Sequence, residues 1–202
     1  MPSERVIWLP GAGGEGRFWL PACEMVRHPG DQVLFDWPGF GPNPPRADIT
    51  SADDMYRLVK AHIDRPVDIV AQSMAGLFAI RAALEHLDLV QRLVLVATSG
   101  GVRAVRELAE VDWRPEFTAS YPSAPSWAVD DRTDFTPRLS ELTLPVLLLR
   151  GDADPISPPS AGRKLKEMLP NTRLHVVDGG DHAFAHDRAL EVAPMIAAFL
   201  ME

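Results

Sequence analysis

Six short runs of hydrophobic residues recur along the chain, and each is followed by Gly, Pro, Asp or Ser within a few positions. The runs are Val6–Leu9, Val33–Phe35, Val67–Ala71, Leu93–Ala97, Val146–Leu149 and Leu174–Val177. Because they are continuous rather than alternating with polar residues, they are typical of strands that are buried on both faces of a parallel sheet.

Helical periodicity occupies most of the intervals between these runs. It covers Ser51–Ile63, behind a Thr-Ser cap signal, and then Ala75–His86, Ser160–Met168 and Ala189–Leu200. Strands that alternate with helices predict an α/β fold with a mostly parallel sheet of about six strands and helices on both faces. The length of 202 residues favours one domain spanning residues 1–202.

The stretch from residue 100 to residue 143 breaks this rhythm. It contains four prolines and no buried-strand signal, and five of the fifteen aromatic residues of the chain lie in it. They are Trp113, Phe117, Tyr121, Trp127 and Phe135. A long segment of this kind, inserted before the penultimate strand, predicts a short helical lid or cap. The alternative is a peripheral helical decoration that packs on its own apolar side chains.

Composition and charge narrow the range of partners. The net charge of −8 disfavours a nucleic-acid partner or an anionic membrane surface, because the phosphate charges would repel the protein. A single cysteine, Cys23, excludes an internal disulfide and a cysteine-rich metal site. No secretory leader or long apolar span is visible in the sequence. We therefore expect a cytoplasmic protein with a small-molecule substrate, and a homodimer is possible.

The sharpest local signal is a buried strand, a serine and a helix in the order Val67 to Leu77. Ser73 lies in the turn, between the small residues Ala71 and Ala75. A nucleophile elbow requires small side chains at these positions because strand and helix approach each other closely there. A helix that begins after the serine also directs its amides toward a developing oxyanion. The alternative is that Ser73 only caps the helix.

A nucleophilic serine needs a base and an orienting carboxylate. Asp152 and Asp154 follow the fifth hydrophobic run, and His182 follows the sixth. Carboxyl ends of parallel strands meet at one edge of the sheet, and the order Ser, Asp, His is that of an elbow-type hydrolase. His186 competes with His182 as the base. His175 lies inside the last run, where a buried core histidine is expected.

The first run ends in a glycine-rich loop, where Gly11, Gly13 and Gly16 spell the spacing G-x-G-x-x-G. This pattern suggests the alternative hypothesis of a dinucleotide-binding loop, in which Asp36, after the second run, would bind the ribose. The bulk of Trp37, directly after Asp36, argues against a ribose at that position.

In combination these segments resemble the α/β-hydrolase fold superfamily, of the cofactor-free serine hydrolase and esterase type. The segments that carry the resemblance are residues 9–14, 36–41, 71–75, 144–155 and 180–182. Two features depart from the usual pattern. Pro10 stands where the family often has a histidine, and Ala71 and Ala75 replace the glycines of the elbow.

The resemblance implies a role for each matching residue. Ser73 would be the nucleophile, His182 the base and Asp154 the acid, and the backbone N–H groups of Ala12 and Met74 would form the oxyanion hole. No organic cofactor and no metal is implied.

We therefore expect a serine hydrolase of the carboxylic-ester type that acts through an acyl-enzyme on a small to medium, partly apolar substrate. The aromatic residues expected to bind substrate are Trp37, Phe40, Trp113 and Trp127. Other triad chemistry, such as perhydrolysis or lyase activity, stays open. A non-catalytic binding member of the same fold and a Rossmann-type dinucleotide-dependent oxidoreductase are the alternatives.

Overall fold

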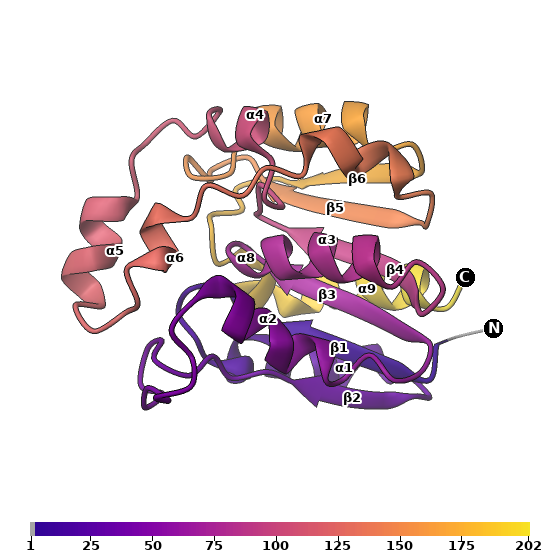
Figure 1. Cartoon of the computed structure of the whole chain (residues 1–202). Coiled ribbons are helices and arrows are strands. Elements are labelled where there is room, and N and C mark those ends of the chain that lie inside the picture. The colour runs from indigo at the N-terminus through magenta and orange to yellow at the C-terminus, as the bar shows by residue number, and fades with distance from the viewer. Residues whose placement is uncertain (1–2) are drawn as a thin grey trace.

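The computed structural model describes residues 3–202 and contains a six-stranded sheet in which all neighbouring strands are parallel (Figure 1). The strand order is β2-β1-β3-β4-β5-β6. The strands are β1 (Arg5–Leu9), β2 (Asp31–Leu34), β3 (Val67–Gln72), β4 (Val90–Val96), β5 (Val146–Gly151) and β6 (Thr172–Val177). The predicted α/β class and parallel sheet are confirmed.

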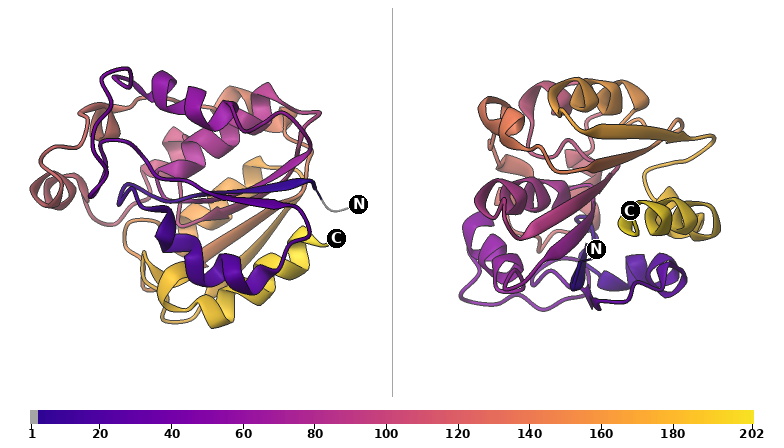
Figure 2. Two further views of the ribbon diagram at one scale, coloured as in Figure 1. Left: turned by 90° about the horizontal axis from the view of Figure 1, so that it is seen from below. Right: turned by 90° about the vertical axis from the view of Figure 1, so that its right-hand side faces the viewer.

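Helices cover both faces of the sheet, as the two views of Figure 2 show. One face carries α2 (Ala52–Lys60), α3 (Ala75–Glu85) and α7 (Pro159–Met168), and the other carries α1 (Leu20–Val26), α8 (Phe184–Asp187) and α9 (Ala189–Leu200). The side chains of one strand alternate between two separate cores: Ile7 of β1 packs in the first core and Trp8 in the second. Both positions are therefore apolar, which explains the continuous hydrophobic runs.

The expected burial on both faces is wrong for the two edge strands. Val33 and Leu34 of β2 are only partly buried, and His175 and Val176 of β6 are exposed. An edge strand has a neighbour on one side only, and the helices cover it incompletely. His175 is therefore a surface residue rather than a buried core histidine.

Helix α1, which contains Pro21, was not among the helices expected from the sequence. The proline occupies the first turn of α1, where a backbone N–H has no partner inside the helix anyway. The preceding Trp19 is fully buried, and its indole Nε1 donates to the carbonyl of Leu9 at 2.9 Å. This bond attaches the start of α1 to the end of β1.

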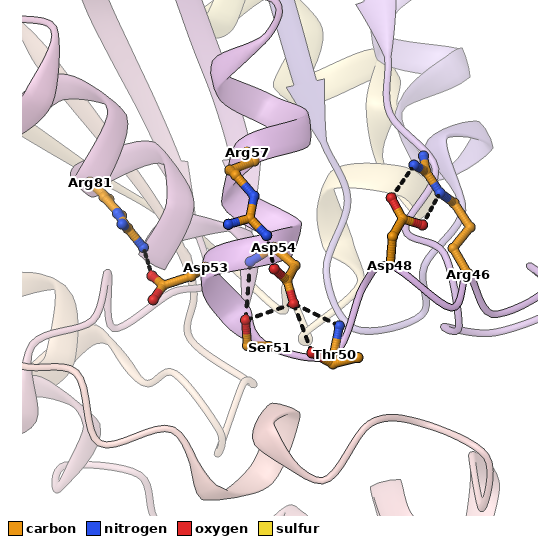
Figure 3. Close-up of polar contacts among 8 residues, drawn as sticks. All are labelled: Arg46, Asp48, Thr50, Ser51, Asp53, Asp54, Arg57 and Arg81. Atoms are coloured by element: carbon orange, nitrogen blue, oxygen red, sulfur yellow. Dashed lines mark hydrogen bonds and ion pairs between the residues drawn. The ribbon is translucent and has the colours of Figure 1, made fainter.

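Helix α2 begins at a capping box (Figure 3). The hydroxyl of Ser51 accepts from the N–H of Asp54 at 3.2 Å, and the carboxylate of Asp54 accepts from the N–H of Thr50 at 2.8 Å. Such reciprocal bonds satisfy amides that the first turn of a helix leaves free. The ion pair between Asp53 and Arg81 then joins α2 to α3.

The segment from residue 100 to 143 contains α4 (Arg103–Arg106), α5 (Arg114–Ser120), α6 (Trp127–Asp130) and the 3-10 helix η2 (Thr136–Glu141). Helices α5 and α6 lie beyond the carboxyl ends of the strands, away from the body of the sheet (Figure 1). Neither of these two helices has a fully buried residue. Residues 3–202 contain no helix with the length and apolar character that crossing a membrane requires.

Candidate active site

The candidate residues gather where β3, β5 and β6 end. Ser73 directly follows β3, Asp154 comes three residues after the last residue of β5, and His182 lies in the loop after β6. Parallel strands place all three loops at one edge of the sheet, where open α/β sheets bind ligands.

Ser73 has a left-handed backbone conformation, with φ of +53°. A non-glycine residue is strained in this region, and such residues cluster at functional sites. The N–H of Ser73 donates to the carbonyl of Val96 at 2.9 Å, which attaches the turn to β4. Ala71 and Ala75 are fully buried on either side of the turn, so alanine is small enough for this elbow.

At Gly76, the start of α3 lies very close to the side chain of Thr98. A Cβ atom there would lie 2.2 Å from the hydroxyl oxygen of Thr98, so only glycine fits. That hydroxyl donates a hydrogen bond to the carbonyl of Ser73. Thr98 was not expected from the sequence to be part of the site. Its position directly after the fourth hydrophobic run could have indicated that it lies at the same edge of the sheet as Ser73.

Ser73, His182 and Asp154 form one hydrogen-bonded line. His182 Nε2 lies 2.9 Å from the hydroxyl oxygen of Ser73, and His182 Nδ1 lies 2.8 Å from Oδ2 of Asp154. An ionised carboxylate only accepts hydrogen bonds, so Nδ1 carries the proton and Nε2 is free to accept one from the serine. The arrangement is that of a nucleophile, a base and an orienting acid.

The carboxylate of Asp154 is anchored by its own loop. Its second oxygen accepts from the N–H groups of Ile156 at 2.9 Å and Ser157 at 3.0 Å, and the side chain is 2% exposed. Asp152 is exposed, and its carboxylate accepts from the N–H of Gly179 at 2.6 Å. Asp152 therefore supports the turn after β6, while Asp154 reaches the imidazole.

His186, the competing base, points to a different partner. Its Nδ1 lies 2.9 Å from the carbonyl oxygen of Phe18, and its ring stacks on the ring of Phe18 with centroids 5.6 Å apart. It lines the same cavity as Ser73. The hydrogen bond to Ser73, however, is made by His182.

Two backbone N–H groups are available beside Ser73. Ala12 and Met74 both line the cavity, and neither amide donates to another group within residues 3–202. The approach of the loop to β3 is very close, since a Cβ atom on Gly11 would lie 2.0 Å from the side-chain oxygen of Gln72. The side-chain amide nitrogen Nε2 of Gln72 in turn donates to the backbone carbonyl of His182 at 3.1 Å. Gln72 is a second supporting residue that the sequence analysis did not identify.

A cavity of about 1020 Å³ opens above these residues, between the strand ends and the segment 100–143. Its wall includes Trp113 and Trp127, as expected. The expectation for Trp37 and Phe40 is wrong: both are fully buried in the core and are not part of the wall. The indole of Trp37 donates to the carbonyl of Pro10 at 2.6 Å, and this bond attaches the glycine loop to the core.

The acid proposed for a ribose is engaged elsewhere. The carboxylate of Asp36 accepts from the N–H of Gly16 at 2.7 Å and so closes the glycine loop on itself. The buried ring of Trp37 follows it directly. These contacts give Asp36 a structural role in the glycine loop. Within residues 3–202, no group of three His, Cys, Asp or Glu side chains is placed to hold a metal ion.

Comparison with known proteins agrees with the fold. The profile of the family described as "Alpha/beta hydrolase family" matches residues 6–141, and that of "TAP-like protein" matches residues 110–202. A pimeloyl-[acyl-carrier protein] methyl ester esterase of Neisseria meningitidis serogroup C is 30% identical over 73% of this chain and 74% of its own. A thermophilic esterase from Thermogutta terrifontis superposes with a TM-score of 0.77 at 19% identity, covering 98% of this chain and 89% of that one.

The polyketide synthase ThaQ of Burkholderia thailandensis is 28% identical over 98% of this chain, which spans only 12% of the length of that synthase. The match to the hydrolase profile covers well over half of the chain. The expectation of a carboxylic-ester hydrolase is confirmed at the level of enzyme class. The chain belongs to the α/β-hydrolase family.

Proposed function

We propose that the chain is a serine hydrolase that cleaves a carboxylic ester through Ser73, His182 and Asp154. The observation that carries the proposal is the hydrogen-bonded line from the Ser73 hydroxyl to His182 and on to Asp154. If Ser73 only capped the helix, its hydroxyl would not require an imidazole within hydrogen-bond distance. A dinucleotide-binding loop would not require this set of hydrogen bonds either.

In the first half of the reaction, the hydroxyl oxygen of Ser73 attacks the ester carbonyl while Nε2 of His182 takes its proton. The carbonyl oxygen becomes negatively charged and accepts from the N–H groups of Ala12 and Met74. Each such donor typically contributes about 3 kcal/mol to lowering the barrier. The imidazolium then protonates the departing alcohol, which leaves an acyl group on Ser73.

In the second half, water attacks the acyl-enzyme and gives a proton to Nε2 of His182. The same two amides stabilise the second tetrahedral intermediate. Protonation of the Ser73 oxygen then releases the carboxylic acid. Asp154 holds the imidazole in the required tautomer throughout.

The lining of the cavity supports a small to medium, partly apolar substrate. Met74, Leu77 and Val105 line it, together with aromatic residues of the segment 100–143. We propose that this segment acts as the lid of the site. The esterase name of the meningococcal relative supports an ester bond as the target.

A fluorophosphonate probe tests the proposal without knowledge of the substrate, because it reacts with an activated serine. We expect the wild-type chain to be labelled and to hydrolyse short p-nitrophenyl esters, and Ser73→Ala to do neither. Ser140→Ala, at an exposed serine of η2, serves as the matched control and should be labelled like wild type. Peptide mapping of the label identifies the modified serine.

Two results would contradict the proposal. Attachment of the label to Ser99 or Ser157, both in the cavity wall, would refute the assignment of the elbow. A folded wild-type chain that takes no label would favour a binding protein of the same fold over an enzyme.

A further inference from the structure

Arg150, near the end of β5, is a buried cation close to the site. Among the arginines of residues 3–202 it is the one with no exposed surface. Its guanidinium donates to the hydroxyl of Ser157 at 2.9 Å and to the carbonyl of Thr98. A Cβ atom on Gly162 of α7 would lie 2.7 Å from Cγ of Arg150, so the glycine makes room for the side chain.

Both partners of Arg150 also contact the proposed catalytic residues. The N–H of Ser157 donates to Asp154 at 3.0 Å, and the hydroxyl of Thr98 donates to the carbonyl of Ser73. One guanidinium therefore connects the loop of the acid with the turn of the nucleophile. No carboxylate of residues 3–202 lies within 4.0 Å of it, so the link to Asp154 runs through Ser157.

The charge of Arg150 is retained at neutral pH. Burial lowers the pKa of the guanidinium to about 10, and the negative charge of Asp154 acts in the opposite direction. A buried charge is expensive unless a charge of opposite sign compensates for it. Asp154, itself 2% exposed, is the charge that does so here.

We propose that Arg150 is a positioning residue for the reaction, which fixes the loop of Asp154 and places a positive charge near the carboxylate that bonds to His182. This inference rests on the proposed function. Arg150 does not line the cavity, so it acts through Asp154, Ser157 and Thr98 rather than on the substrate.

The direction of the expected effect follows from the sign of the charge. A nearby cation disfavours addition of a proton to the pair formed by His182 and Asp154. Without that cation the pair holds its proton to higher pH, and the protonated imidazole cannot act as the base. The low-pH limb of kcat/KM should therefore move to higher pH when the charge is removed.

The test uses Arg150→Met, which keeps much of the side-chain volume and removes the charge. We expect the low-pH limb to move upward by about one pH unit, kcat to fall about tenfold or more, and KM to change little. Arg150→Lys should return the limb toward its wild-type position. A limb that stays in place in folded Arg150→Met would overturn the proposal, even if kcat and the melting temperature both fell.

Arg92→Met is the matched control. Arg92 is nearly buried in β4, but its partner Asp68 lies near the start of β3, at the opposite edge of the sheet. This variant should lose stability without moving the limb. If Arg92→Met moved the limb as far as Arg150→Met does, general destabilisation would explain both shifts and the proposal would fail.

Ser157→Ala decides the matter if Arg150→Met does not fold. It removes the hydroxyl that accepts from Arg150 and keeps the N–H that donates to Asp154. A smaller upward shift supports the proposal, and an unchanged limb overturns it. NMR titration of the His182 ring reports the same shift without substrate, so a failure of the proposed hydrolysis would be distinguishable from a failure of the role of Arg150.

Discussion

Clusters of the same three residue types lie at the two opposite edges of the sheet. The carboxyl edge carries Asp154, His182 and Arg150, and the amino edge carries Asp68, His28 and Arg92. In both clusters the aspartate is almost completely buried. Residue type and burial therefore do not distinguish the proposed active site from the other cluster.

Contact geometry separates the two clusters. At the amino edge, His28 Nε2 lies 3.9 Å and Arg92 Nη1 3.6 Å from the carboxylate of Asp68, too far for hydrogen bonds. Within residues 3–202, only the hydroxyl of Ser3 donates to it, at 2.8 Å. Burial raises the pKa of Asp68 to about 6, and burial together with the charge of Arg92 lowers the pKa of His28.

At the carboxyl edge, both oxygens of Asp154 accept hydrogen bonds, and His182 bonds to a partner at each ring nitrogen. The side chain of His182 is 28% exposed and lines the cavity, whereas that of His28 has no exposed surface. The two clusters thus differ in whether hydrogen bonds align the aspartate and the histidine with a serine that lines the cavity.

The largest expected difference between the clusters is in catalysis by the two histidines. His182→Ala removes the base, and kcat/KM should fall by about three orders of magnitude or more. His28→Ala should lower the melting temperature and leave kcat within a few-fold of wild type. Steady-state kinetics with a p-nitrophenyl ester, alongside thermal melts, measures both effects. Retained activity in His182→Ala with loss in His186→Ala would move the base to the competitor.

The second comparison concerns the two aspartates after β5. Asp154→Asn leaves the imidazole without its acceptor, and kcat should fall by about 10⁴ with little change in melting temperature. Asp152→Asn weakens the bond to the N–H of Gly179, and the free energy of unfolding should fall by about 1 kcal/mol with only a modest loss of kcat. If the two variants exchanged these effects, Asp152 would be the acid.

The pH dependence of the free energy of unfolding probes the cluster at the amino edge. The folded pKa of Asp68 is about 6, above the value near 3.9 of an unfolded aspartate, so the folded state holds this proton more tightly. The resulting stability is present below about pH 4 and is lost as the pH rises through 6, to a total of about 3 kcal/mol. His28, whose pKa is lowered, contributes the opposite slope, so the test compares wild type with Asp68→Asn.

Urea unfolding at several values between pH 4 and pH 7 measures this contribution. The fall in stability that accompanies deprotonation of Asp68 should be absent in Asp68→Asn and present in Asp31→Asn, a substitution at an exposed carboxylate of β2. Identical pH profiles for wild type and Asp68→Asn would show that Asp68 titrates normally in the folded state.

Features that depend on local pattern could be predicted from the amino-acid sequence alone. Each hydrophobic run became a strand with bounds within a few residues of those expected, and helices α2, α3, α7 and α9 lie where the periodicity placed them. The order of a serine, an aspartate and a histidine at strand ends was enough to predict that such a set would meet, although Ser73 and His182 are 109 positions apart in the sequence. The reason is that a parallel sheet brings all its carboxyl ends to one edge. The choice of Asp154 over Asp152 came from the family resemblance.

Features that depend on neighbours distant in sequence could not be predicted in this way. Trp37 and Phe40 pack in the core rather than in the cavity, and His175 is exposed because β6 is an edge strand. The pattern of hydrophobic residues is the same for a central strand and an edge strand, so only the strand order separates them. Likewise, Arg150 reads as the polar end of an apolar run, and its link to Asp154 exists only because Ser157 folds back onto it. Burial and hydrogen bonding are properties of the assembled layers, and no local pattern encodes them.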